Sequence, residues 1–473
     1  MSGTTFLPRT PKHLPAPKRQ LIQPFQVGDP LTVPAFSFRL VGGGHYQTDI
    51  TCRLVGTHCY IFVENDMWGT DRVTQSGIES LARAFDNATN RDPDRGIFTV
   101  DIDLFGPPPN VDGDPRILIV ILDVLDSPIT GTTFVGYFDV ENQSPPISRE
   151  IIYLDSNPLD IHTDLARATL AHEFQHLLHW AADPDEDKWL DEGCSEYAEL
   201  ACGYRDTTEA ATEDFLTLAT NTGLTEWEDL PFDFDQAFLW MTYFAQRYGD
   251  ASLRQLVADP ENGIASVNNL LTTLNVPERF EHLHGAWTAA LYLDGPDNLG
   301  LKRLDLGPVK QDSFAVPTTQ ISRNVTLWGT DFLTFGDAPG LSIDIGSTGN
   351  ENLLVTLITK GDNPSAAPLA ISSGTRKRIH TFTTGTHALS VTGTSGGLQS
   401  FSFSVTALEG TSPTASDFDA NGEIGFSDFL RFAENFNRSA GLPNFDPTFD
   451  LDGDHKVGFS DFLIFAGNFG KTP

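Results

Sequence analysis

Apolar and polar positions follow two different periods in the first third of the chain. From about residue 48, runs of β-branched and aromatic residues predict strands over residues 50–55, 59–63, 97–104, 117–124 and 134–138. A helical pattern interrupts these runs at residues 73–88. The pattern therefore predicts that residues 45–163 form a mixed α/β segment.

Helical periodicity dominates residues 164–305. Residues 165–182 contain no Gly or Pro, Thr163 or Asp164 can cap the first turn, and Asp183-Pro184 ends the pattern. Further helices are predicted over about residues 191–202, 235–248 and 277–292.

Alternation with a period of two returns over residues 306–410, with Gly, Ser and Thr between the runs. This pattern predicts an antiparallel β domain of the sandwich type. Residues 411–473 contain a repeat at a spacing of 33, DFDANGEIGFSDFLRFAENF from Asp417 and DLDGDHKVGFSDFLIFAGNF from Asp450. A repeat of this kind indicates a duplicated module. The Pro-rich residues 1–44 are expected to be an extended tail, with a pro-segment as the alternative.

Composition narrows the classes of partner. The chain has 30 Lys and Arg against 64 Asp and Glu, a net charge of −34, which repels nucleic acids and anionic lipids. The longest apolar run, residues 117–122, is far shorter than the ~20 residues of a membrane-spanning helix. No signal peptide is visible near the N-terminus. The spacing of the cysteines predicts neither a disulfide scaffold nor a zinc knuckle: Cys52, Cys59, Cys194 and Cys202.

The strongest chemical signal is His172-Glu173-Phe174-Gln175-His176, which lies inside a predicted helix. Residues four apart share a helix face, so both imidazoles can bind one metal ion while Glu173 stands near a metal-bound water. A catalytic zinc needs a third protein ligand and an open position. The next predicted helix carries Glu192 and Glu196, and one of these carboxylates can bind the metal while the other orients a ligand histidine.

Other ligand sets compete with this one. A metzincin would need Gly at position 179 and His at position 182, and the chain has His179 and Ala182, which excludes that class. His179 lies two turns from His172, about 10 Å away, so a structural histidine is the better interpretation. Asp183 as the third ligand and a helix that merely exposes His and Glu are the remaining alternatives.

Two groups of motifs carry a family resemblance. HEFQH followed by WLDEG resembles the gluzincin metallopeptidases, and HCYIFVEN, VDGDPRILIVILDVLD, GYFDVEN and AHEFQHLLHW are similar to the hyicolysin-like bacterial secreted peptidases over about residues 45–290. The resemblance implies an α+β zincin-like catalytic domain that binds a peptide along an edge strand, expected by position at residues 133–137. It implies His172, His176 and Glu192 as zinc ligands, Glu173 as general base and Glu196 as the partner of a ligand histidine. A shorter gap than in relatives leaves Glu196 as an alternative ligand. The candidates for stabilising the oxyanion are Tyr197, Tyr204 and Tyr243.

The two repeats have the spacing of a calcium loop, with ligands at positions 1, 3, 5, 7 (through the backbone carbonyl) and 12. The predicted calcium ligands are Asp417, Asp419, Asn421, Glu423 and Asp428 in the first repeat and Asp450, Asp452, Asp454, Lys456 and Asp461 in the second. Gly422 stands at the sharp turn of the first loop, and His455, which tolerates positive φ better than bulkier residues, replaces it in the second. Asp at position 12 and the tandem copy resemble dockerin type I repeats, which implies a small all-α module and a cohesin-like partner.

The sequence thus predicts a multidomain, zinc-dependent endopeptidase, extracellular or at the cell surface, docked through a calcium-binding C-terminal module. The alternative is a non-catalytic extracellular adhesion or scaffold protein that uses a zincin fold. A zinc hydrolase acting on non-peptide substrates is a third hypothesis.

Overall fold

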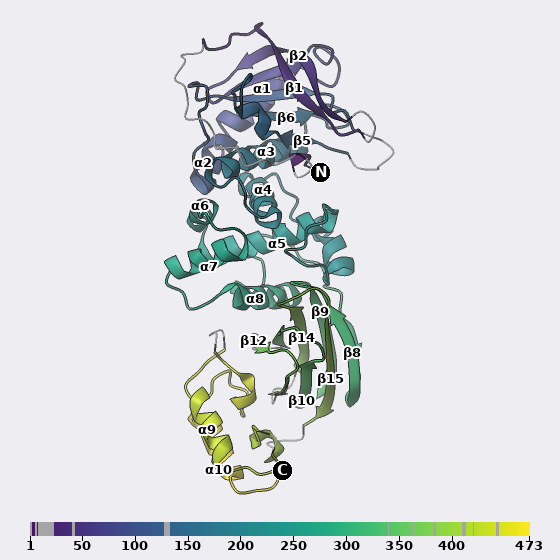
Figure 1. The fold of residues 1–473 in the computed structure, drawn as a ribbon, viewed down its shortest axis with the longest axis vertical. Helices are drawn as coiled ribbons and strands as arrows, with labels where there is room; N and C mark the ends of the chain where they lie inside the picture. The colour runs from purple at the N-terminus through teal and green to yellow at the C-terminus, as the bar shows by residue number, and fades with distance from the viewer. Residues whose placement is uncertain are drawn as a thin grey trace. The chain divides into compact units, whose positions relative to one another are not determined.

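The computed structural model describes residues 2–4, 7, 23–39, 43–126, 133–338, 340–361, 364–381, 385–408, 413–419, 421–440 and 444–473 (Figure 1). The chain divides into two compact units. Unit 1 comprises Met1–Asp206 and Asp229–Ser266, and unit 2 comprises Thr207–Glu228 and Val267–Pro473.

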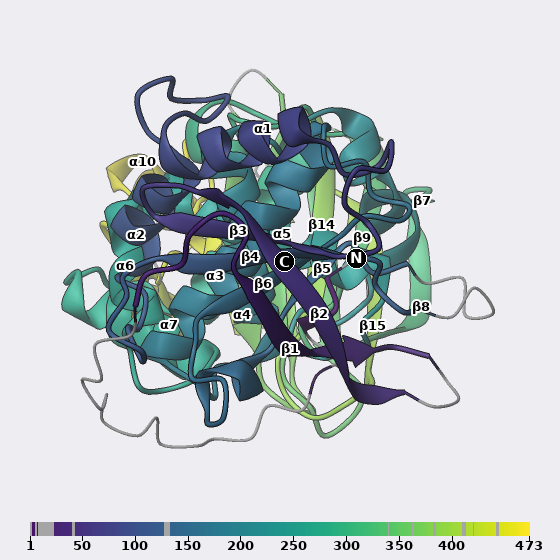
Figure 2. The same ribbon diagram turned by 90° about the horizontal axis from the view of Figure 1, so that it is seen from above.

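Unit 1 is built on a six-stranded sheet of order β1-β2-β3-β4-β6-β5. Its strands are β1 (Pro30–Ser37), β2 (Gly44–Val55), β3 (Cys59–Glu64), β4 (Ile117–Leu122), β5 (Gly136–Phe138) and β6 (Ile151–Asp155). The pairs β3–β4 and β4–β6 are parallel, and the other pairs are antiparallel. Strands β4 and β6 are buried throughout, as expected of apolar runs in a sheet covered on both faces. The long pair β1 and β2 stands out in purple in Figure 2.

Two expectations for this region are wrong. Strand β1 lies inside the segment expected to be a tail, and it pairs with β2 from Pro30 to Ser37. Residues 97–104, predicted as a strand, belong to helix α2 (Ile97–Phe105). The buried side chains of α2 include Ile97, Val100 and Leu104, which recur at helical spacing, so its β-branched composition concealed a helical period.

The helices of unit 1 include the two, α3 and α4, that carry the predicted metal ligands. They are α1 (Gln75–Asp86), α2, η2 (Val140–Gln143), α3 (Asp164–Ala182), α4 (Lys188–Cys202), α5 (Pro231–Tyr248) and α6 (Ala251–Val257). Helix α3 packs against β5, β6 and α4, and α4 packs against α5. Gly193 permits the close approach of α4 to α5, because a Cβ there would lie 3.1 Å from the carbonyl oxygen of Ala237.

Unit 2 contains two sheets, of orders β13-β10-β15-β8 and β12-β11-β14-β9-β7, and both contribute to one hydrophobic core. All strand pairs are antiparallel except β7–β9. The strands are β7 (Asp312–Phe314), β8 (Thr318–Val325), β9 (Thr330–Ala338), β10 (Leu341–Ser347), β11 (Leu353–Lys360), β12 (Ser365–Ile371), β13 (Arg376–Thr381), β14 (Gly385–Gly393) and β15 (Gln399–Ala407).

The boundary between the units differs from the one expected at residue 305. The second segment of unit 2 begins inside α7 (Ile264–Thr273) and includes α8 (Phe280–Leu293) and η5 (Asp297–Leu299). Its first segment contains η3 (Glu209–Ala211) and η4 (Phe215–Ala219). Helix α8 belongs to unit 2 because it packs on β11 and β12. Thr288 on α8 also forms a 2.8 Å hydrogen bond with Ser390 on β14.

The two repeats form helices α9 (Phe426–Asn435) and α10 (Phe459–Asn468), preceded by η6 (Pro413–Ser416) and η7 (Pro447–Phe449). Part of their surface joins the core of the β sheets, including Phe432, Phe445, Phe449 and Val457. The hydroxyl of Thr448 donates a 3.0 Å hydrogen bond to the carbonyl oxygen of Arg378 on β13. The repeats are therefore packed onto the β sheets of the same unit.

Cys52, Cys59, Cys194 and Cys202 are buried, and none forms a disulfide. Within the ranges that the structure describes, no helix combines the length and the apolar character needed to cross a bilayer.

Candidate metal centre

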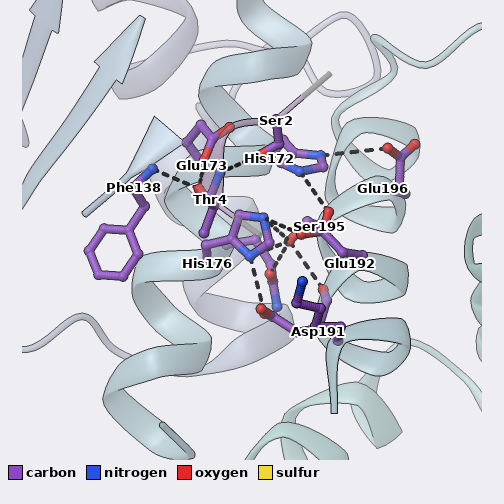
Figure 3. A network of polar contacts seen from close by, with 12 residues as sticks. Ser2, Thr4, Phe138, His172, Glu173, His176, Asp191, Glu192, Ser195 and Glu196 are labelled. Atoms are coloured by element: carbon purple, nitrogen blue, oxygen red, sulfur yellow. Dashed lines mark hydrogen bonds and ion pairs between the residues drawn. The ribbon is translucent and has the colours of Figure 1, made fainter. Parts of the chain in front are cut away.

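Helices α3 and α4 bring together the three predicted zinc ligands (Figure 3). Nε2 of His172 lies 3.2 Å from Oε2 of Glu192, and Nε2 of His176 lies 3.3 Å from Oε1 of the same carboxylate. All three side chains are buried, and Glu192 is 0% exposed. Ser195 on α4 donates a hydrogen bond to Gln175 on α3, which helps to hold the two helices in register.

The donor atoms fit a zinc ion. Nε2 of His172 and both carboxylate oxygens of Glu192 are buried, and their contacts of 3.2 and 3.3 Å within the described site are not well-aligned hydrogen bonds. Leaving such groups unsatisfied costs free energy, so their convergence favours a ligand that binds all of them. Two imidazoles and one carboxylate are a donor set of catalytic zinc sites.

The charge at this site also favours a cation. Burial raises the pKa of Glu192, but the neighbouring His176 and His172 outweigh it and lower the pKa to about 2. Burial lowers the pKa of His176, but Asp191 and Glu192 outweigh it and raise the pKa to about 9. The buried carboxylates therefore need a positive charge between them, which protons or a metal ion can supply.

The second nitrogen of each histidine has its own carboxylate partner. Nδ1 of His172 lies 3.0 Å from Oε1 of Glu199 and 3.8 Å from Oε1 of Glu196. Nδ1 of His176 lies 3.1 Å from Oδ1 of Asp191. Such contacts fix the orientation of a metal-binding imidazole. The sequence predicts Glu196 in this role, whereas Glu199 and Asp191 were not predicted.

Arg205 forms an ion pair with Glu196, the carboxylate that was predicted to orient a ligand histidine. Its Nη1 forms an ion pair with Oε2 of Glu196 and lies 3.6 Å from Oε2 of Glu199, and its Nη2 lies 3.3 Å from Oδ1 of Asp235. Burial raises the pKa of Glu196 to about 7 although Arg205 opposes the shift. Glu196 is therefore tied mainly to Arg205, and Glu199 is the nearer partner of His172.

His179 and Asp183 lie outside the group of converging ligands. Nδ1 of His179 lies 3.0 Å from Oδ1 of Asp191 and 3.2 Å from Nε2 of Gln175, and the side chain is buried. These contacts suit a structural histidine. Neither His179 nor Asp183 belongs to a group of described residues whose ligand atoms are close enough to share a metal ion.

Glu173 lies next to the edge strand β5 and is 0% exposed. Gly136 on β5 permits this approach, since a Cβ there would lie 3.2 Å from Cγ of Glu173 and 2.5 Å from Cγ2 of Thr169. Oε2 of Glu173 accepts a 2.6 Å hydrogen bond from the hydroxyl of Thr4. Of residues 133–137, where the edge strand was expected, only Gly136 and Tyr137 belong to a strand, β5, which lies at the edge of the sheet.

Two of the three tyrosines expected to stabilise the oxyanion hydrogen-bond to other side chains, and the third is partly buried. The hydroxyl of Tyr197 donates a 2.6 Å hydrogen bond to Asp250, and the hydroxyl of Tyr243 accepts one of 3.5 Å from Arg247. Burial raises the pKa of Tyr204 to about 12. These contacts do not single out any of the three as the oxyanion residue.

The two repeats bring their acidic residues together as the spacing predicts. In each repeat, one carboxylate oxygen from each member of an acidic group lies within 4.8 Å of those of the other members. The two groups are Asp417, Asp419 and Asp428, and Asp450, Asp452, Asp454 and Asp461. Gly422 has φ of 86° and His455 has φ of 69°, so the histidine does adopt the left-handed turn. Burial, with Asp461 nearby, raises the pKa of Asp450 to about 7.

Comparison with known proteins gives one partial match in sequence. No family model matches the chain. The neutral metalloprotease ShpI of Staphylococcus hyicus is 25% identical over 232 residues, which cover 44% of this chain and 51% of that protein. The chain thus spans about half the length of this relative.

Solved structures give only distant likenesses. The pre-peptidase C-terminal domain of a Bacillus anthracis collagenase is 16% identical and covers 22% of this chain and 100% of its own, with a TM-score of 0.17. The Yersinia pseudotuberculosis-derived mitogen is 11% identical and covers 20% of this chain and 89% of its own, also with a TM-score of 0.17. At TM-scores this low, these structures indicate neither the fold nor the function of this chain.

Proposed function

We propose that this protein is a zinc-dependent endopeptidase of the gluzincin type. The observation that carries the proposal is the convergence of His172, His176 and Glu192 beside Glu173 in a buried site. This arrangement combines three protein ligands with an adjacent carboxylate, Glu173, in the position of a general base. The partial similarity to a metalloprotease supports the same chemistry.

The chain's own residues divide the work of peptide hydrolysis. When bound, zinc supplies a Lewis acid that makes an attacking water more acidic. Glu173 accepts the proton of that water and passes it to the leaving amine. Glu199 and Asp191 orient His172 and His176 through their Nδ1 atoms. The edge strand β5 binds an extended peptide by backbone hydrogen bonds.

The C-terminal part of unit 2 is proposed to add a docking function. The β sheets form a sandwich-like accessory domain, and the two acidic loops bind Ca²⁺ in the manner of dockerin repeats. The exposed faces of α9 and α10 include Phe426, Leu430, Phe459 and Leu463, which are available to a cohesin-like partner. These assignments imply an enzyme that works outside the cell.

Zinc analysis combined with casein cleavage tests the proposal. The purified chain should hold one zinc ion and cleave casein, and a zinc chelator should abolish the cleavage. Glu173→Gln should keep the zinc and lose at least about nine-tenths of the rate, because the amide cannot exchange the proton. Glu150→Gln is the matched control, since Glu150 is also buried in unit 1 but hydrogen-bonds to the backbone of Val111. Bound zinc without casein cleavage would favour a non-peptide substrate or a scaffold.

A further inference from the structure

A short N-terminal stretch of this chain lies against the edge strand β5. The amide nitrogen of Gly3 donates a 2.8 Å hydrogen bond to the carbonyl oxygen of Gly136, and Ser2 forms a parallel bridge with the same residue. The amide nitrogen of Phe138 donates a 2.8 Å hydrogen bond to the hydroxyl of Thr4. These are the donor and the acceptor through which β5 would bind an extended peptide.

The same stretch engages Glu173. The hydroxyl of Thr4 donates to Oε2 of Glu173 over 2.6 Å, and both residues are buried, Thr4 at 3% and Glu173 at 0% exposure (Figure 3). In the proposed reaction a water molecule must donate its proton to this carboxylate. The Thr4 hydroxyl therefore stands where the reacting water would have to donate.

The side chains on either side of Thr4 are closely fitted. Leu7 is 7% exposed and lines a cavity together with Val140, His176 and Trp180. A Cβ at Gly3 would lie 2.6 Å from Cζ of Phe38, so only glycine fits at that position without a shift. The fit involves backbone, hydroxyl and apolar contacts at once.

We propose that Ser2–Thr4 and Leu7, which we call the N-terminal plug, inhibit the enzyme by occupying the peptide-binding edge of β5 and the proton acceptor Glu173. The inference rests on the proposed function and adds a regulatory occupant to it. A peptide substrate and the plug compete for the same backbone groups of β5. Removal or displacement of the plug is then the step that opens the site.

Two readouts test this proposal, one of binding and one of activity. The full chain is compared with a variant that begins at Gln23 and with the full-length variants Gly3→Val and Thr4→Val. Thr32→Val is the matched control, because the exposed Thr32 also donates a 2.6 Å hydrogen bond to a carboxylate, that of Asp49. A fluorescent peptide of residues 2–10, SGTTFLPRT, is titrated into each protein, and casein cleavage is measured in parallel.

If the plug occupies the site, the truncated variant that begins at Gln23 should bind the peptide, and the full chain should exclude it. A tethered segment acts at an effective concentration on the order of millimolar, so its removal should raise casein cleavage by about tenfold for a peptide that binds in trans with a Kd near 100 μM. The peptide carrying Thr4→Val should bind about tenfold more weakly, because it leaves a buried carboxylate unsatisfied. Thr32→Val should behave like the wild type.

Each result decides one question. No peptide binding and an unchanged casein rate in the Gln23 and Gly3→Val variants would overturn the plug while leaving the peptidase assignment intact. Peptide binding that the full chain excludes, without casein cleavage by any variant, would support the plug and contradict the proposed function. If the Gln23 variant does not fold, Gly3→Val in the full chain carries the test, because it displaces the plug through Phe38 without altering the metal centre.

Discussion

Nδ1 of His172 lies 3.0 Å from Glu199 and 3.8 Å from Glu196, so the carboxylate one turn further along α4 is the nearer partner. Glu196 is held by Arg205 on its other oxygen. A carboxylate behind a ligand histidine orients the ring and increases its basicity. The two glutamates are therefore expected to differ in their effect on metal binding.

Glu199→Gln should weaken zinc binding by about tenfold or more, the usual effect of removing such a partner. Glu196→Gln, the matched substitution, should change zinc affinity by less than about threefold and act mainly on stability, because it leaves Arg205 with one carboxylate fewer. Competition with a chromophoric chelator measures both affinities. An equal loss in the two variants would mean that both glutamates orient His172.

Glu150 gives unit 1 a predictable dependence on pH. Burial raises its pKa from 4.5 to about 7. The folded state therefore binds more protons than the unfolded state between these values, and stability is lost as the pH rises from about 4.5 to about 7. Glu150→Gln should remove a loss on the order of 3 kcal/mol, estimated at 1.36 kcal/mol per pKa unit.

Urea unfolding of wild type and Glu150→Gln at pH 5 and pH 8 measures this effect. The variant should gain in free energy of unfolding relative to the wild type at pH 8 and much less at pH 5. If the free energies of unfolding of the two proteins differed by the same amount at pH 5 and at pH 8, Glu150 would not titrate as proposed.

Removal of calcium should loosen the acidic loops of the repeats far more than the catalytic helices. Each loop gathers several carboxylates that repel one another without a cation. The effect should centre on residues 417–428 and 450–461, because Phe432 and Phe449 remain packed in the core of the β sheets. Hydrogen exchange with and without a calcium chelator measures the difference.

The double variant Asp417→Ala and Asp450→Ala should lose high-affinity calcium binding and retain casein cleavage. Asp312→Ala is the control, since Asp312 pairs with Arg323 in the same unit and lies outside both loops. Loss of casein cleavage in the double variant, or no calcium binding by the wild type at millimolar concentration, would count against the modular assignment.

Local signals explain what the sequence predicted correctly. Helix α3 runs from Asp164 to Ala182, as the candidate caps Thr163 or Asp164 and the stop at Asp183-Pro184 predict, although the Thr163 hydroxyl donates to the carbonyl oxygen of Asp160 and makes no capping bond. His455 adopts positive φ because the loop spacing demands a left-handed residue there. Helix α2 was missed because its β-branched residues favour strands locally, although its buried positions recur at helical spacing.

The missed residues of the candidate site differ in how far they were predictable. Glu192, Glu196 and Glu199 follow one stripe of α4 at spacings of four and three, so the sequence did contain a signal for Glu199. Thr4 gave no such signal, because 169 residues separate it from Glu173 and no local period links them. Only the folded chain brings that hydroxyl to the carboxylate.

Diffraction from crystals grown with zinc, recorded on both sides of the zinc absorption edge, tests the central claim most directly. The account predicts one anomalous peak per chain, at about 2.0 to 2.2 Å from Nε2 of His172, Nε2 of His176 and a carboxylate oxygen of Glu192. A peak bound by Glu196 in place of Glu192, or no peak between α3 and α4, would contradict it.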